Sequence, residues 1–426
     1  MSKFIIEGGH PLNGTIKPSG NKNEALPALF ACLLTEEPVT LKNVPRIQDV
    51  LTSCEILRQL GAKVEWLDEE TLLIEAKNLD YKKPDPELCA HIRASILLLG
   101  PLLARFKKVE LPLPGGDIIG ARRIDSHLDS FIDLGAEIEL TNIINAKLRA
   151  FCAGEIFLDE PSVTATENIL LFSAISSGTT TLHNAACEPH VAGLCRMLNN
   201  MGAKITGIGT NQLTIEGVSG LKKASHRISS DFMEIGSFLC LASITQGQIE
   251  ITDVNIKDLR FVLKTLKKVG IKPEIKEKSL IVSDQQELIT EGDATGRVAT
   301  IYTGPWPAFP TDLLSVSIVA ATQSKGTLVF HEKMFESRLF FTDKLMAMGA
   351  NIVLCDPHRV VVTGPAKLKK TNMSSPDVRA GMALLMAALV ASGTSEIHNI
   401  YQIDRGYYQI EKKLESLGAK IKRAKA

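Results

Sequence analysis

The segment Leu60-Gly61-Ala62-Lys63-Val64-Glu65-Trp66-Leu67 decides the fold: an apolar residue, a glycine and an alanine precede alternating apolar and polar residues. The same phrase occurs six times along the chain, at intervals of about 70 residues. The other copies begin at Leu134-Gly135-Ala136, Met201-Gly202-Ala203, Val269-Gly270-Ile271, Met348-Gly349-Ala350 and Leu417-Gly418-Ala419. One structural unit is therefore written six times.

The first copy shows what a unit contains. Apolar residues three or four apart predict an amphipathic helix that ends at Gly61, where glycine takes a left-handed conformation at little cost. Alternation with a period of two predicts strands. The expected elements are a helix over residues 23–34, a strand over 39–41, a helix over 47–60, and strands over 63–67 and 71–75. The last unit is expected to have helices over 377–391 and 404–417 and strands over 394–398 and 419–423.

The order helix, strand, helix, strand, strand predicts an α/β protein whose units pack around a common helical centre. A chain of 426 residues is too long for one core and suits two domains of roughly 200 residues, with three units each. We expect one domain over residues 22–230, carrying a lid loop at 111–122. The other domain is expected to combine 1–21 with 231–426, with the active site in the cleft between the two.

Charge and composition restrict the partners. The 48 basic and 48 acidic side chains give no bulk field that would favour nucleic acid or an anionic membrane. The first residues lack a signal-peptide run, and no window reaches eighteen apolar residues. The eight cysteines, like the His, Asp and Glu residues, lack metal-ligand spacing. We expect a soluble cytoplasmic protein, a monomer or weak homo-oligomer, that acts on small molecules without metal or cofactor.

Polar side chains occupy equivalent helix starts when the six units are aligned. The first helices begin at Lys22 with Asn23, Arg93, Ser162 with Thr164, Asp231 with Glu234, Asp312, and Asp377 with Arg379. The second helices begin at Arg46, Arg122, Glu188, Lys257, Arg338 and Arg405. Each arginine alone could pair with a local acid. Helix starts favour anions, however, and arginine forks fit carboxylates and phosphates, so the cations at these positions predict an anion site.

Asp312 has two readings. It follows Phe309-Pro310-Thr311 at a helix start, where aspartate is commonly a cap. If arginines crowd it, the carboxylate stays ionised at neutral pH and can accept a proton from a substrate hydroxyl. The sequence alone leaves both roles open.

The loop over residues 111–122 departs from the repeat. Two prolines and three glycines surround Asp117, which predicts an irregular and mobile segment. Its glycine spacing lacks the strand, turn and helix frame of a dinucleotide fingerprint. The loop is therefore either a lid that carries an acid or a solvated surface loop.

Several of these segments resemble the UDP-N-acetylglucosamine 1-carboxyvinyltransferases, the enolpyruvyl transferases that begin peptidoglycan precursor synthesis. The segments are Pro18-Ser19-Gly20-Asn21-Lys22-Asn23, Arg93-Ala94-Ser95, Pro114-Gly115-Gly116, Ile119-Gly120-Ala121-Arg122, Phe309-Pro310-Thr311-Asp312, Phe335-Glu336-Ser337-Arg338 and Ile403-Asp404-Arg405-Gly406-Tyr407. The resemblance implies two inside-out α/β barrel domains of three units each. It also implies transfer of the enolpyruvyl group of phosphoenolpyruvate to the 3-hydroxyl of UDP-N-acetylglucosamine, with release of phosphate.

The resemblance implies roles for individual residues. Lys22, Arg122 and Arg405 would hold the phosphate and carboxylate of phosphoenolpyruvate, with Arg338 and Arg379 joining in the closed form. The implied catalytic residues are Asp117, Asp312, Lys22 and Arg405. The implied substrate-binding residues are Lys22, Asn23, Arg93, Arg122, Arg123, Ile124, Asp125, His127, Ser162, Val163, Asp312, Met334, Arg338, Asp377, Arg379 and Arg405.

Asp117 departs from the family pattern. Most members carry Cys at this lid position, where it donates a proton and is alkylated by fosfomycin, whereas some members carry Asp. A carboxyl group can also donate a proton, but it is a far poorer nucleophile toward an epoxide than a thiolate. We therefore expect an active enzyme that is insensitive to fosfomycin.

Two smaller departures concern the nucleotide side of the site. Glu160 stands where Lys is usual, and Thr164 where Gly is frequent. They leave other acceptors open, namely a UMP-type nucleotide or, less readily, shikimate 3-phosphate. A non-catalytic nucleotide-sugar-binding paralogue would be expected to lose Lys22, Asp312 or Arg405, and all three are present.

Overall fold

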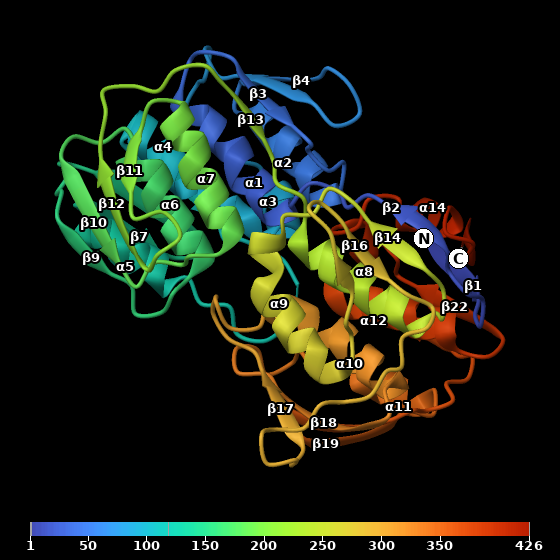
Figure 1. Cartoon of the computed structure of the whole chain (residues 1–426). Coiled ribbons are helices and arrows are strands. Elements are labelled where there is room, and N and C mark those ends of the chain that lie inside the picture. The colour runs from blue at the N-terminus through green and yellow to red at the C-terminus, as the bar shows by residue number, and fades with distance from the viewer. Residues whose placement is uncertain (1, 118, 426) are drawn as a thin grey trace. The chain divides into compact units, whose positions relative to one another are not determined.

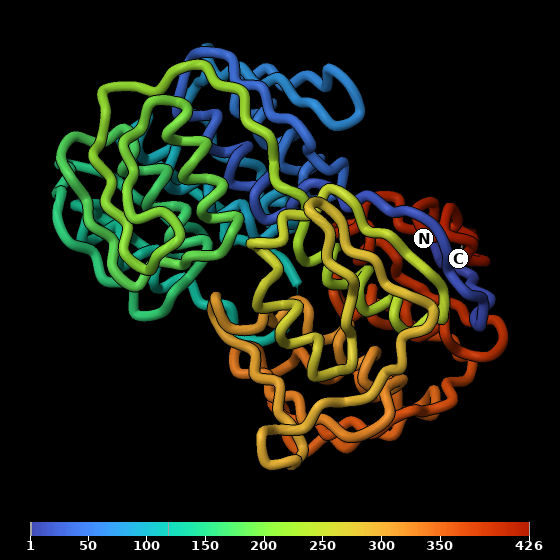
Figure 2. The backbone as a smooth tube through the Cα atoms, in the orientation of Figure 1, coloured from blue at the N-terminus to red at the C-terminus, as the bar shows by residue number. Residues whose placement is uncertain are grey.

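The computed structural model describes residues 2–117 and 119–425, which form two compact units. Unit 1 contains residues 2–19, 119–121 and 230–425, and unit 2 contains residues 20–117 and 122–229. The terminal segments lie side by side in unit 1 (Figures 1 and 2), where β1 (Ser2–Glu7) pairs antiparallel with β23 (Lys420–Lys425). Within the described ranges, no helix has the length and apolar character to cross a membrane.

Unit 2 contains three sheets and the helices between them. The helices are α1 (Lys22–Ala31), α2 (Gln48–Gln59), α3 (Pro86–His91), α4 (Leu99–Phe106), α5 (Asp125–Asp133), α6 (Val163–Ser173) and α7 (Pro189–Asn200), with 3₁₀ turns η1 (Cys32–Leu34) and η2 (Arg93–Leu98). The first sheet has the order β13 (Ala224–Arg227), β3 (Val39–Lys42), β5 (Leu72–Glu75), β4 (Lys63–Trp66). The second has the order β6 (Lys108–Pro112), β8 (Ile143–Leu148), β7 (Ala136–Leu140), and the third β11 (Lys204–Thr206), β12 (Gln212–Glu216), β10 (Thr179–His183), β9 (Glu155–Phe157).

Unit 1 repeats this plan. Its helices are α8 (Phe232–Ile244), α9 (Ile256–Val269), α10 (Leu314–Gln323) after the 3₁₀ turn η3 (Thr311–Leu313), α11 (Thr342–Ala347), α12 (Val378–Val390), α13 (Tyr401–Asp404) and α14 (Ile410–Glu415). One sheet has the order β15 (Glu274–Ile275), β16 (Leu280–Val282), β14 (Ile249–Ile251), β2 (Gly14–Ile16). The other two are β17 (Ala299–Tyr302), β18 (Gly326–His331), β20 (Arg359–Gly364), β19 (Asn351–Asp356), and β21 (Asn372–Ser374), β22 (Thr394–His398), β1, β23. These six small sheets, most of them mixed in direction, agree with the six predicted repeats.

The first helix of each repeat is the most buried element. Every residue of α8 is buried, as are all but the last residue of α12, and both helices pack against α10. A helix that is apolar on every side belongs in a core. The second helices, such as α9, bury one face only, as the 3.6-residue period predicts.

The repeated glycines have the conformation expected from the sequence. Gly61 has φ +97°, which confirms the predicted left-handed end of the helix. The equivalent glycines have φ values of +94° at Gly135, +106° at Gly202, +98° at Gly270, +99° at Gly349 and +98° at Gly418. The repeat is therefore a repeat of backbone geometry as well as of sequence.

Two expectations about secondary structure were wrong. The structure has a short strand before the first helix of a unit that the predicted unit did not include. This strand pairs in parallel with the next strand, as β9 does with β10 and β21 does with β22. Strands of three or four residues are too short for their period to be read from the sequence. The helix expected over 404–417 is also divided into α13 and α14, because Gln409 has a left-handed φ of +45°.

Apart from residues 119–121, which belong to unit 1, the described chain passes from one unit to the other at two points, and the first lies between Ser19 and Gly20. In unit 2, Asn21 N donates to Ser229 O at 2.7 Å and the Asn21 side chain caps α1. The carboxylate of Glu24, buried in the first turn of α1, accepts from Ser229 N at 3.2 Å and contacts His226 Nε2 at 2.8 Å.

Unit 1 has the same arrangement at the second passage, between Ser229 and Ser230. Asp231 N donates to Ser19 O at 2.8 Å and the Asp231 side chain caps α8. The buried Glu234 carboxylate accepts from Ser19 N and from Lys413 Nζ, the latter at 2.8 Å. Both first helices therefore start from a backbone fixed by a cap and a buried carboxylate.

Two glycine variants in unit 2 test the left-handed helix ends. Gly202→Ala would cost about 1–2 kcal/mol of unfolding free energy, because φ is +106° but open space surrounds the added methyl. Gly61→Ala would cost about 1–3 kcal/mol more, since the methyl would lie 2.7 Å from Asn78 O. Urea unfolding of both variants measures the difference, and equal losses would contradict the steric argument.

Candidate active site

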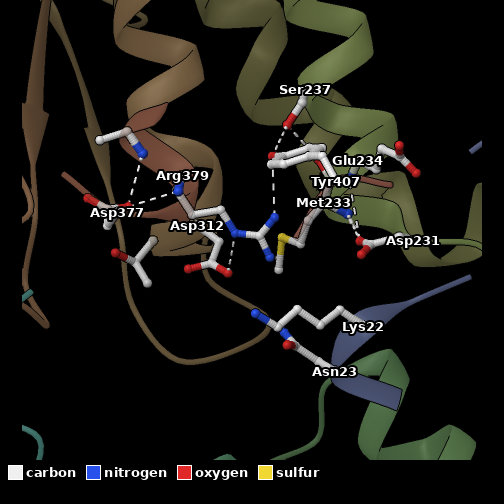
Figure 3. Close-up of polar contacts among 12 residues, drawn as sticks. Lys22, Asn23, Asp231, Met233, Glu234, Ser237, Asp312, Asp377, Arg379 and Tyr407 are labelled. Carbon is white, nitrogen blue, oxygen red and sulfur yellow. Dashed lines mark hydrogen bonds and ion pairs between the residues drawn. The ribbon is translucent and has the colours of Figure 1, made fainter. Parts of the chain in front are cut away.

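Asp312 is held by two guanidinium groups. Its Oδ1 accepts from Arg338 Nη2 at 2.9 Å. Its Oδ2 accepts from Arg379 Nε at 2.9 Å, as Figure 3 shows. The cap position of α10 is Leu313, and no side chain caps this helix. The Asp312 carboxylate is therefore crowded by arginines, which is the arrangement that one of its two readings requires.

A second set of contacts fixes Arg379. Its backbone N–H donates to the capping carboxylate of Asp377 at 2.8 Å, and Nη1 donates to Tyr407 Oη at 3.3 Å. Tyr407 Oη lies 3.1 Å from Ser237 Oγ, which donates to Met233 O (Figure 3). Arg379 can only donate to Tyr407 Oη, and the Ser237 hydroxyl proton is used on Met233 O, so the tyrosine proton is directed to Ser237 Oγ.

Arg379 and Tyr407 keep their protonation states at neutral pH. Burial by itself lowers the pKa of Arg379, but the negative charge of Asp312 and the contributions of Tyr407 and Asp231 outweigh it and raise this pKa well above its usual value. Burial also raises the pKa of Tyr407, so the phenol remains protonated. The cluster therefore presents an ionised Arg379 beside a neutral phenol.

Arg338 retains an unused donor. Its side chain is 3% exposed, and Nη1 lies 3.6 Å from Asp377 Oδ1. Its Nε has no hydrogen-bond partner within residues 2–117 and 119–425. A buried donor without an acceptor is costly, and an anionic ligand would supply the missing acceptor.

The other two residues implied for unit 1 have partners of their own. Arg405 is 5% exposed and donates through Nη1 to Gln402 Oε1 at 3.0 Å. Met334 N donates to the buried Glu332 at 2.7 Å, which holds the turn, while the Met334 side chain is 39% exposed.

In unit 2, Arg93 organises the chain after the loop. Its Nη2 donates to Arg122 O at 2.9 Å and to Arg123 O at 2.8 Å. Burial, followed by the nearby charge of Arg122, lowers the pKa of Arg93 to about 10, so the guanidinium is still charged at neutral pH. Arg93 therefore fixes the backbone that leads into α5.

Lys22, at the start of α1, lies beside an acid that the sequence analysis missed. Its Nζ is 2.7 Å from Asp49 Oδ2, in the first turn of α2. Asp49 is 4% exposed, and its position in a first turn was the only sequence signal. Asn23, the next residue of α1, is half-buried.

The loop around Asp117 has no regular helix or strand over residues 113–117 and 119–124. Its start is pressed against α3, because Gly115 N donates to Cys89 O at 3.2 Å and a Cβ at Gly115 would lie 1.6 Å from Ala90 O. Asp117 is half-buried in unit 2, whereas residues 119–121 belong to unit 1, where Ala121 N donates to Glu336 at 3.2 Å.

The remaining implied residues gather at the starts of α5 and α6. Arg123 forms an exposed 3.0 Å ion pair with Asp125, and Ile124 occupies the cap position of α5. Ser162 caps α6 ahead of Val163, and the fully buried His127 lies 3.0 Å from the Thr164 hydroxyl. Within the residues described, no group of three or more His, Cys, Asp or Glu side chains could hold a metal ion.

The fold matches that of known enolpyruvyl transferases. The crystal structure of the enolpyruvyl transferase NikO from Streptomyces tendae has a TM-score of 0.88 and 22% sequence identity, covering 100% of this chain and 99% of that one. EPSP synthase from Acinetobacter baumannii has a TM-score of 0.76 and 18% identity, covering 100% of both chains. At these identities the likeness establishes the fold alone, and it defines an enolpyruvyl transferase fold.

Sequence comparison defines the family. The model of EPSP synthase (3-phosphoshikimate 1-carboxyvinyltransferase) matches residues 6–414. UDP-N-acetylglucosamine 1-carboxyvinyltransferase from Bradyrhizobium diazoefficiens is 51% identical over 421 residues, which cover 99% of this chain and 98% of that protein. The enzyme of the same name from Treponema denticola is 49% identical over 421 residues, 99% of each. The chain belongs to the UDP-N-acetylglucosamine 1-carboxyvinyltransferase family, as the motifs led us to expect, and is therefore an enzyme.

Tyr407→Phe tests the contacts that fix Arg379. Loss of the hydroxyl leaves a buried Arg379 donor without its acceptor, so we expect the free energy of unfolding to fall by about 1–3 kcal/mol in urea titrations. Tyr408→Phe is the matched control, since Tyr408 is less buried and its hydroxyl accepts from the neighbouring Gln409. Equal stability of the two variants would show that Tyr407 does not stabilise the cluster.

Proposed function

We propose that the protein transfers the enolpyruvyl group of phosphoenolpyruvate to the 3-hydroxyl of UDP-N-acetylglucosamine and releases phosphate, the first committed step of peptidoglycan precursor synthesis. The observation that carries this proposal is the carboxylate of Asp312 held between Arg338 and Arg379. The reaction needs both kinds of group, because the donor carries a phosphate and a carboxylate and the acceptor hydroxyl must lose a proton.

The reaction balances in two stages. A proton adds to the methylene carbon of phosphoenolpyruvate while the sugar 3-oxygen bonds to the adjacent carbon and its hydroxyl proton passes to a base. The tetrahedral adduct then loses phosphate: the bond between the tetrahedral carbon and the phosphate oxygen breaks, the oxygen leaves with phosphorus, and loss of a methyl proton restores the double bond. One proton is therefore added to carbon, and two are removed.

The cations account for donor binding. Lys22, Arg122 and Arg405 are proposed to hold the phosphate and carboxylate, joined by Arg338 and Arg379. Arg338 supports this role best, since its unused Nε donor needs an acceptor. Lys22 and Arg122 belong to unit 2, and Arg338, Arg379 and Arg405 belong to unit 1.

Asp312 is proposed as the base at the 3-hydroxyl. Both of its oxygens accept hydrogen bonds from guanidinium groups here, which lowers their capacity to accept a proton. An anionic donor substrate competes with Asp312 for Arg338 and Arg379. Substrate binding would thus release an oxygen of the base at the moment when the base is needed.

Asp117 is proposed as the proton donor to the methylene carbon. It lies on an irregular loop whose start is held against α3, and this agrees with a lid that carries an acid. A carboxyl group gives up its proton readily but reacts poorly with an epoxide. The enzyme is therefore proposed to be insensitive to fosfomycin.

The acceptor is proposed to lie along the starts of α5 and α6. Arg93 fixes the carbonyl groups of Arg122 and Arg123, and Ser162 fixes the first turn of α6. Asn23, Asp125, His127, Val163 and Met334 are proposed to complete this side of the site. Glu160 and Thr164 depart from the family pattern on the nucleotide side of the site, so the contacts with the acceptor could differ there. Other acceptors are therefore included in the assay.

Phosphate release from phosphoenolpyruvate tests the proposal directly. We expect release with UDP-N-acetylglucosamine and none with UMP or shikimate 3-phosphate, because only the first offers a uridine diphosphate and a sugar 3-hydroxyl together. Fosfomycin should leave the rate of the wild-type enzyme unchanged. The Asp117→Cys variant should be active without fosfomycin and should be inactivated by it. If UMP supports phosphate release and UDP-N-acetylglucosamine does not, the acceptor is a UMP-type nucleotide. A covalent fosfomycin adduct on wild-type Asp117 would contradict the role proposed for this residue.

Asp312→Asn separates the base from a merely structural anion. Loss of a general base should lower kcat by about 10²–10⁴-fold. The dissociation constant of phosphoenolpyruvate should stay equal or fall, because the competing charge is gone. Asp356→Asn is the matched control, since Asp356 forms an exposed ion pair with Arg359 in the same unit. Weaker phosphoenolpyruvate binding with unchanged kcat would show that Asp312 only positions the arginines.

A further inference from the structure

A buried histidine links α5 to α6. His127 is 1% exposed, and its Nε2 lies 3.0 Å from Thr164 Oγ1. Its Nδ1 lies 2.9 Å from Nδ2 of Asn168, which is fully buried one turn further along α6. These three side chains form a continuous hydrogen-bonded relay, Asn168–His127–Thr164, that ends at the half-exposed threonine.

Two backbone groups fix the direction of this relay. Gly100 N, which can only donate, contacts Asn168 Oδ1 at 2.9 Å, and Ile96 O, which can only accept, lies 2.8 Å from Asn168 Nδ2. The amide of Asn168 therefore has one orientation. Its second Nδ2 hydrogen is donated to His127 Nδ1, which must be the accepting nitrogen of the ring.

The orientation of the threonine hydroxyl follows from the ring. Burial, with the charge of Arg93 second, lowers the pKa of His127 to about 3, so the ring is neutral at physiological pH. A neutral ring that accepts at Nδ1 carries its proton on Nε2 and donates it to Thr164 Oγ1. The hydroxyl proton of Thr164 therefore points away from His127.

Thr166 shows the contrast within the same helix. Its hydroxyl donates to Ser162 O at 2.9 Å and accepts from Ala186 N at 2.9 Å, so both of its functions are used inside the fold. Thr164 is half-exposed in the first turn of α6, and its hydroxyl is held as a donor by side chains that are themselves buried.

We propose that Thr164 donates a hydrogen bond to an oxygen of the uridine nucleotide, and that His127 and Asn168 are positioning residues that fix this direction. The inference rests on the proposed function, in which the adjacent Ser162 and Val163 line the nucleotide sugar. Glycine at this position, which is frequent in the family, has no such donor. Thr164 is thus a residue by which this chain adjusts its hold on the acceptor substrate.

Kinetics of three variants test the donor. Thr164→Val keeps the shape but removes the hydroxyl, and it should raise KM for UDP-N-acetylglucosamine about five- to tenfold, with kcat and KM for phosphoenolpyruvate within twofold. Thr164→Ser should restore the wild-type KM. Thr206→Val, an exposed threonine of β11 in the same unit, is the matched control. An unchanged KM in Thr164→Val would overturn the proposal.

Asn168→Asp tests the positioning role. An aspartate accepts from Nδ1, so the ring would carry its proton there, Nε2 would accept from Thr164, and the hydroxyl could no longer donate to the nucleotide. KM should rise as in Thr164→Val, and the double variant should show no further loss. Additive losses would mean that Asn168 affects binding by another route.

A third measurement does not depend on turnover. Long-range ¹H–¹⁵N spectra at pH 7, with the His127 signals assigned through His127→Gln, should show a neutral ring protonated at Nε2. A proton at Nδ1 would overturn the relay.

Titration with uridine and with UDP locates the contact of Thr164. If Thr164→Val weakens the binding of uridine and of UDP equally, the contact is on the nucleoside. If it weakens the binding of UDP alone, the contact is on the diphosphate. If wild-type protein binds UDP with this pattern but shows no turnover, the proposed function fails while the donor assignment stands. No binding of UDP would overturn both.

Discussion

The backbone at the two passages between units is the constraint on which the rest of the structure depends. At each passage, a carboxylate buried in the first turn of a helix accepts a hydrogen bond from a backbone N–H of the segment that crosses between the units. Glu24 in α1 accepts from Ser229 N, and Glu234 in α8 accepts from Ser19 N. A buried charge is tolerated only with partners, which His226 and Lys413 supply. The side chains that begin these helices therefore project from a fixed backbone, as precise positioning of substrate requires.

The Asp312 cluster follows the same rule, that a buried charged group needs partners. Arg338 and Arg379 pair with Asp312, and Asp377 lies 3.6 Å from Arg338, yet Arg338 Nε keeps an unused donor. A buried donor without an acceptor is costly, and this cost underlies the proposal that a phosphate or carboxylate binds here. The contacts of Arg379 with Tyr407 and Asp377 limit how far this arginine can move when the anion enters.

The sequence was sufficient for the features that repeat and insufficient for those that occur once. Six equivalent glycines and alternating strands reveal the units, and equivalence between units made the arginines recognisable. The left-handed Gln409 that divides the helix expected over 404–417 has no such signal, because glutamine rarely adopts that conformation. Asn168 was also missed, although a fully buried amide in an apolar helix is unusual and needs partners that only the fold reveals.

The repeat also explains why a site forms where it does in unit 1. The buried helices α8, α10 and α12 pack against one another, and Asp231, Asp312 and Asp377 occupy or adjoin their starts. Arg379 forms an ion pair with Asp312, its backbone N–H donates to Asp377, and the charge of Asp231 raises its pKa. The three helix starts therefore lie around the one residue Arg379 (Figure 3). A residue at a helix start can change without disturbing the apolar core behind it. Chemistry can therefore vary there while the repeated framework stays constant.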